Sequence, residues 1–96
     1  MGSPVIRQGT DISTGHDGYF PVVPVAGSGN VFVNGLPVVR SGDAYNPHSK
    51  KDHPPHTGIA VGGGTVFVNG KQAQRVGDSN TCGDHASSGS PNVRFG

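Results

Sequence analysis

Short apolar runs that end in Asn-Gly dominate the pattern of hydrophobic and polar positions along this chain. The pentapeptide VFVNG occurs at residues 31–35 and again at 66–70, an offset of 35 residues. An Asn-Gly dipeptide next to an apolar run is a strong signal for a two-residue β-hairpin turn. We therefore predict hairpins at residues 30–40 and 65–75, each followed by an Arg-x-Gly turn.

Both hairpins belong to a longer repeat. Its copies are GSGNVFVNGLPVVRSGD at 27–43, GGGTVFVNGKQAQRVGD at 62–78, and a third copy divided between PVIRQGTD at 4–11 and GSPNVRFG at 89–96. A fixed period of this kind is typical of repeated supersecondary units. We predict a single domain, 1–96, without a further attached domain. Its units are approximately 4–35, 36–70 and 71–96.

The segments between the hairpins are predicted to be irregular. Residues 19–26 read YFPVVPVA, an extended segment that two prolines confine to an edge or polyproline-like path. Residues 43–58, DAYNPHSKKDHPPHTG, contain three prolines and three histidines without periodicity, so we expect a long loop there. No segment has a helical pattern, and the fold class is all-β.

Composition indicates an ordered domain with a small core. Only 31% of the residues are hydrophobic, and the chain has 17 Gly and 8 Pro. The glycines recur at matching repeat positions, as turns and close backbone contacts require. A single cysteine excludes an internal disulfide, so a metal or a partner must supply the missing stabilisation.

Charge and hydropathy exclude several function classes. The net charge of +1 provides no basic field for nucleic acid. No apolar run is long enough for a transmembrane helix, and the N-terminus lacks the charged and apolar regions of a signal peptide. We expect synthesis in the cytoplasm without a cleaved leader.

Aligning the three Arg-x-Gly turns reveals candidate metal ligands. An Asp follows each turn, and His16, His48 and Cys82 come four or five residues after it. If the three units surround a pseudo-threefold axis, these side chains converge. Zinc is the metal that best suits mixed His and Cys donors.

A fourth donor would close a tetrahedral zinc site. His56 is the first choice, because the HPPHTG segment ends the inserted loop and its prolines would rigidify the approach. His53 and His85 remain alternatives. A closed site with three His and one Cys leaves no position for water and would be structural.

Other chemistry finds little support. The chain contains no Glu, which excludes an HExxH zincin motif, and nothing matches a phosphate-binding GxxxxGK[ST] loop. The three equivalent arginines are expected to brace their turns by pairing with the Asp that follows. A small zinc hydrolase with three ligands and a bound water, or a zinc-dependent module for another partner, stays open as an alternative.

The repeated segments, the terminal GSPNV and the His and Cys positions together resemble PAAR-repeat proteins. This resemblance implies a small cone of short β-hairpins with pseudo-threefold symmetry, without substantial helix. It also implies one structural zinc ion near the apex. Position by position, the ligands fall on His16, His48, His56 and Cys82. The namesake Pro-Ala-Ala-Arg is present only as the degenerate LPVVR and KQAQR.

The resemblance also implies a function. PAAR-repeat proteins are non-enzymatic tips that cap and sharpen the trimeric β-helical spike of type VI secretion systems, or of contractile phage tails. The implied partner is a trimeric VgrG-like or phage spike protein bound at the base of the cone. A monomeric tip, noncovalently bound effectors, transient contact with the target membrane and delivery outside the cell are further expectations.

Overall fold

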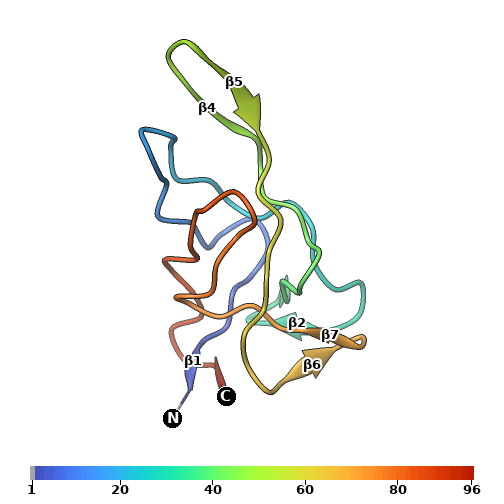
Figure 1. Cartoon of the computed structure of the whole chain (residues 1–96). Helices are drawn as coiled ribbons and strands as arrows, with labels where there is room; N and C mark the ends of the chain where they lie inside the picture. Colours follow the sequence, from blue (N-terminus) through green and yellow to red (C-terminus); the bar gives the residue numbers. More distant parts are fainter. Residues whose placement is uncertain (1) are drawn as a thin grey trace.

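The computed structural model describes residues 2–96 as an elongated molecule of 39 × 25 × 20 Å (Figure 1). These residues form eight short strands and no helix, and so no helix that could cross a membrane. The strands are β1 (Ser3–Pro4), β2 (Phe32–Val33), β3 (Leu36–Pro37), β4 (His48–Lys50), β5 (His53–His56), β6 (Phe67–Val68), β7 (Lys71–Gln72) and β8 (Arg94–Phe95). The predicted all-β class is confirmed.

Two hairpins form where the repeated VFVNG predicts them. β2 pairs with β3 and β6 with β7, both antiparallel. The connecting Asn34 and Asn69 have φ angles of 53° and 54°, and the glycines that follow have φ angles of 77°. Two successive positive φ angles define the type I′ turn, which Asn-Gly favours. The strands are shorter than the predicted spans. Val38 and Ala73, which follow β3 and β7, donate to Val31 and Val66 of their own hairpins and also bridge to Arg7 and Arg40.

A third pair comes from the two ends of the chain. β1 pairs with β8 in antiparallel register, with Ser3 opposite Phe95 and Pro4 opposite Arg94. Both ends lie beside β2, β6 and β7 in Figure 1, away from β4 and β5. The repeat copy that is divided in the sequence is thus joined in space.

The three units are connected by a closed ring of main-chain hydrogen bonds. The N–H of Ile6 donates to the carbonyl of Gln74, that of Gln74 to Val39, and that of Val39 to Ile6, at 2.9–3.1 Å. The segments around Ile6, Val39 and Gln74 therefore each pair with both of the others. None of the three has a free strand edge at these residues. These cyclic contacts agree with a three-unit repeat, while the pseudo-threefold symmetry and the unit boundaries stay predictions.

The core consists of two small apolar clusters. Successive residues of each ring segment enter different clusters, as alternation along an extended chain requires. The first cluster comprises Val5, Val33, Val38, Val68 and Ala73. The second comprises Ile6, Val39, Tyr45, Ala60 and Ala86. Gln74, at the ring position of Ile6 and Val39, is also buried, and its Oε1 accepts a 2.6 Å hydrogen bond from the Tyr45 hydroxyl.

Three arginines brace the turns, as expected from the sequence. Each donates through Nε and Nη2 to a nearby carboxylate, and its main-chain N–H donates to the same group. The pairs are Arg7 with Asp11, Arg40 with Asp43, and Arg75 with Asp78. The extra residue before Asp11 leaves these contacts unchanged.

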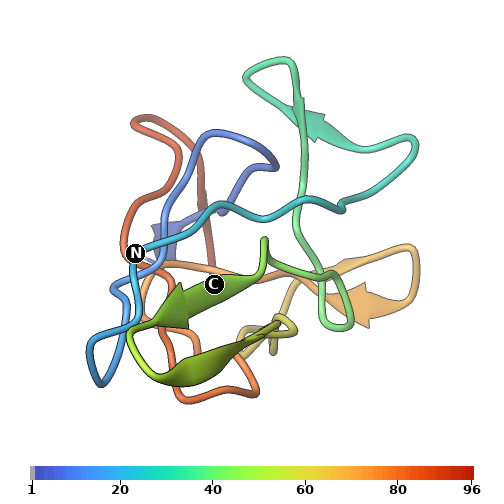
Figure 2. The same cartoon turned by 90° about the horizontal axis from the view of Figure 1, so that it is seen from above.

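The expected loop at residues 43–58 contains a hairpin. β4 pairs with β5, His48 standing opposite His56 and Lys50 opposite His53, with a register irregularity between the two pairs. This hairpin projects from the end opposite to the chain termini (Figure 1) and, seen from above, lies across the middle of the molecule (Figure 2). Pro54 and Pro55 are compatible with β5 because this two-stranded sheet has no third strand to pair with.

Candidate metal centre

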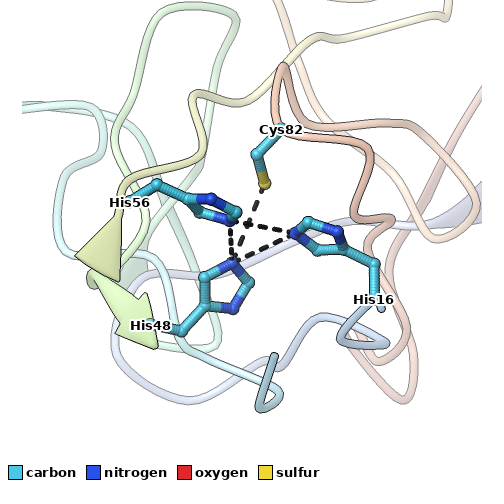
Figure 3. A group of neighbouring side chains, drawn as sticks. All are labelled: His16, His48, His56 and Cys82. Atoms are coloured by element: carbon cyan, nitrogen blue, oxygen red, sulfur yellow. Dashed lines mark hydrogen bonds between the residues drawn. The ribbon is translucent and has the colours of Figure 1, made fainter. Parts of the chain in front are cut away.

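Four side chains from three separate segments converge at the base of the β4–β5 hairpin. Their candidate ligand atoms all lie within 4.8 Å of one another (Figure 3). They are the imidazoles of His16, His48 and His56 and the thiol of Cys82. His48 is buried and the other three are partly buried.

A tight turn delivers His16. The N–H of Tyr19 donates to the carbonyl of His16 at 2.6 Å, and the two residues form an antiparallel bridge. Between them Asp17 and Gly18 have φ angles of 46° and 85°. Asp-Gly is a preferred pair for such a turn because both residues tolerate positive φ. His16 and Tyr19 therefore face each other across a miniature hairpin.

The β4–β5 hairpin delivers two ligands together. His48 begins β4 and His56 ends β5, and the register places them directly opposite each other. Residues opposite each other on antiparallel strands project to the same face of the sheet. Both Nε2 atoms consequently point to the same side, 2.7 Å apart.

A turn flanked by the buried residues Asn80 and Asp84 carries Cys82. The N–H of Asn80 donates to the carbonyl of Asp84 across it, and the Asp84 side chain accepts from the Thr14 hydroxyl at 2.8 Å and from the N–H of His85 at 2.9 Å. Burial raises the pKa of Asp84, but these and other hydrogen bonds outweigh it and lower the pKa below its usual value. The ionised Asp84 thus ties the Cys82 turn to the segment that carries His16.

The three imidazole nitrogens cannot satisfy one another. Nε2 of His16 lies 3.3 Å from that of His48 and 3.0 Å from that of His56. A ring nitrogen offers either one proton or one lone pair, so among three mutually close nitrogens at least one pair is donor against donor or acceptor against acceptor. A shared cation removes this conflict, since all three nitrogens then act as lone-pair donors.

The tautomer of His48 agrees with metal binding. Its Nδ1 lies 2.6 Å from the carbonyl oxygen of Phe20, so Nδ1 carries a proton and donates it. The neutral ring then has its lone pair on Nε2, facing the cluster. Such an outer hydrogen bond is the usual device that orients a histidine ligand.

The spacing suits a tetrahedral ion. Zinc bonds of about 2.1 Å to nitrogen and about 2.3 Å to sulfur place tetrahedral nitrogens about 3.4 Å apart, with sulfur about 3.6 Å from each nitrogen. The nitrogens lie 2.7–3.3 Å apart and Sγ of Cys82 lies 3.9 Å from Nε2 of His48. Three imidazoles and one thiol form a donor set that zinc accepts, and the residues present fit the ion.

Electrostatics favour the neutral, ligand-competent form of His56. Partial burial, together with the neighbouring His48 and His16 imidazoles, lowers its pKa below the ordinary value of a histidine. A lower pKa means less competition from protons for the Nε2 lone pair at neutral pH.

Of the three candidates for the fourth position, His56 lies in the cluster. His53 and His85 are both exposed and lie outside it. His53 pairs with Lys50, farther along the hairpin than the His48–His56 pair, and its imidazole is not among the clustered side chains. The sequence analysis missed the surroundings of the site, Tyr19 and the Phe20 carbonyl. If the Asp17-Gly18 pair had been interpreted as a hairpin turn, the sequence would have predicted that Tyr19 stands opposite His16.

Comparison with known proteins identifies the family. A search of curated proteins finds no match. A profile of the PAAR motif matches residues 10–88, most of the chain, and this span includes all four clustered side chains. PAAR motif proteins form a structural spike-tip family associated with spike proteins. The chain belongs to the PAAR motif family.

Proposed function

We propose that this protein is a non-enzymatic, zinc-stabilised tip that caps and sharpens a trimeric β-helical spike. The convergence of His16, His48, His56 and Cys82 at the end away from the chain termini carries the proposal. In this role one zinc ion crosslinks three segments in a region too narrow for an apolar core.

The donor set favours this role over hydrolysis. A hydrolytic zinc site keeps one coordination position for water, whereas a structural site fills all four with protein ligands. The cluster supplies four donors, three nitrogens and one sulfur, which is the structural pattern.

The opposite end supplies a surface for the spike. Phe32 on β2 and Phe67 on β6 occupy equivalent repeat positions and are 55% and 62% exposed. Arg94 on β8 takes the third equivalent position and is also exposed. Exposed aromatic side chains in repeated hairpins are well suited to bury against a partner. Three similar hairpins also match the end of a trimer, which resolves the mismatch between one chain and three.

In this function the protein is made in the bacterial cytoplasm, docks as a monomer on the spike and leaves the cell with it. Effectors bind noncovalently, contact with the target membrane is transient, and nucleic acid plays no part. A type VI secretion system is the first candidate apparatus, and a contractile phage tail baseplate is the alternative. Which trimer binds decides between the two.

The test is binding to purified trimeric spike proteins of both kinds, measured by co-elution and titration calorimetry. The wild-type chain is expected to bind one kind with one monomer per trimer. The double variant Phe32→Asp and Phe67→Asp should lose binding. Phe20→Asp is the matched control, because Phe20 is 65% exposed but lies beside the metal cluster. Absence of binding to either trimer, or equal binding by the double variant, would contradict the proposal.

A further inference from the structure

One aromatic ring lies against all three histidines of the candidate metal centre. The Tyr19 ring stacks on His56, with ring centroids 4.1 Å apart and an interplanar angle of 28°. It also stacks on His16, at 5.0 Å and 23°, and lies 5.0 Å from His48. These centroid separations fall in the range of favourable aromatic pairs.

A lysine also contacts this ring. Nζ of Lys50 lies 4.9 Å from the centroid of the Tyr19 ring, and it donates a 2.5 Å hydrogen bond to the carbonyl of Asp17. A cation over an aromatic face is attracted by the ring quadrupole. Lys50 belongs to β4, so the contact also joins the projecting hairpin to the turn that carries His16.

From this arrangement we propose that Tyr19 is a positioning residue that covers the metal centre and slows metal release, with Lys50 pinning the ring in place. The inference rests on the metal occupancy proposed above and adds residues that are not ligands themselves. The aromatic ring carries the effect rather than the hydroxyl, because all the contacts described are contacts of the ring.

The physical basis is the freedom of His56. Release of an ion from a closed four-ligand site begins when one ligand dissociates from the metal. His56 ends the strand of a hairpin that projects from the body, and its imidazole is only partly buried. Tyr19 stacks on this imidazole and must move aside before the ring can rotate away. The same ring limits the approach of water or a chelator to the three nitrogens.

The experiment measures zinc release from the full-length, zinc-loaded protein into excess chelating dye, well below the unfolding temperature. Tyr19→Ala should release zinc about tenfold faster or more, the range typical of changes to outer-shell partners. Tyr19→Phe should release zinc at the wild-type rate, and Lys50→Met at an intermediate rate. Asn34→Ala, at the opposite end of the molecule, is the control for a loss of global stability and should not change the rate.

The visible spectrum of cobalt-substituted protein separates covering from ligation. If Tyr19 only covers the site, Tyr19→Ala retains the tetrahedral cobalt spectrum while losing metal faster. Tyr19→Leu, which keeps an apolar side chain, serves where the alanine variant does not fold. Unchanged release from Tyr19→Ala, equal acceleration in Tyr19→Phe, or loss of the tetrahedral spectrum in both the Ala and Leu variants would overturn the inference. A wild-type protein that binds no metal would instead refute the proposed metal centre.

Discussion

The main-chain N–H and the guanidinium Nε of Arg40 both donate to one oxygen of Asp43, at 2.8 and 3.0 Å. Arg40 Nη2 reaches the other oxygen at 3.1 Å. The hydrogen bonds that the guanidinium donates to Asp43 raise the pKa of Arg40, and desolvation of the guanidinium partly opposes this rise. One carboxylate thus satisfies a charged side chain and the main chain of the turn together.

Asp43→Asn should destabilise the fold by about 1–3 kcal/mol, because Asp43 is buried and an amide cannot accept all three donors. Urea unfolding measures this loss. Asp52→Asn is the matched control, since Asp52 is exposed and Asn also tolerates its positive φ of 64°. Equal stability of the two variants would show that the turn does not depend on this carboxylate.

Asn34 combines a backbone role with a side-chain role. Its φ is positive, and its Oδ1 accepts from Arg7 Nη1 at 3.2 Å and from the Ser90 hydroxyl at 2.6 Å. Asn34→Gly keeps the backbone freedom but loses the acceptor, while Asn34→Ala loses both. Thermal unfolding should rank wild type above Asn34→Gly and Asn34→Ala lowest, the latter costing about 1–3 kcal/mol. A glycine variant less stable than the alanine variant would contradict this division.

The metal ligands can be assigned by elemental analysis of single variants. Wild type should contain one zinc per chain. Alanine at His16, His48 or His56, or serine at Cys82, should lose the metal and lower the unfolding midpoint by about 10 °C or more. His53→Ala and His85→Ala are matched controls that should retain both metal and stability. A folded wild type without metal, or a control that loses it, would require a different site.

Acid should weaken the metal-free fold through His56. Its pKa is lower in the folded protein than in the unfolded chain, so its contribution to stability is complete above the unfolded value of about 6.5 and is lost as the pH falls through the folded value. NMR titration should therefore give His56 a lower midpoint in the folded, metal-free protein than in the same protein unfolded in urea. A higher midpoint in the folded protein would contradict the crowding of the three imidazoles.

Tyr45 and Gln74 form a buried polar contact within the second apolar cluster. Burial raises the pKa of Tyr45, so the hydroxyl stays protonated and donates to Oε1 of Gln74. Tyr45→Phe leaves that oxygen buried without its donor and should cost about 1–3 kcal/mol in urea unfolding. Tyr19→Phe is the comparison on a partly buried tyrosine and should change stability little. A neutral Tyr45→Phe would show that Gln74 finds another donor.

Hairpins and turns were predictable from the sequence because they depend on neighbouring residues. Asn-Gly specifies its own turn, and each Arg-Asp pair closes within three or four residues. The repeat register also aligned His16, His48 and Cys82, because equivalent positions in similar units occupy equivalent places.

Only the tertiary structure shows that His56, and not His53 or His85, lies in the cluster. It alone also shows the closed ring of hydrogen bonds through Ile6, Val39 and Gln74, and the position of Tyr19. The choice among the histidines depends on the pairing register of β4 and β5, which a proline-rich segment without alternation does not reveal. The closed ring of main-chain hydrogen bonds and the stacking of Tyr19 on His56 both join residues from different units. Their contacts exist only once the chain has folded, so local sequence determined the parts, and packing between the units determined how they meet.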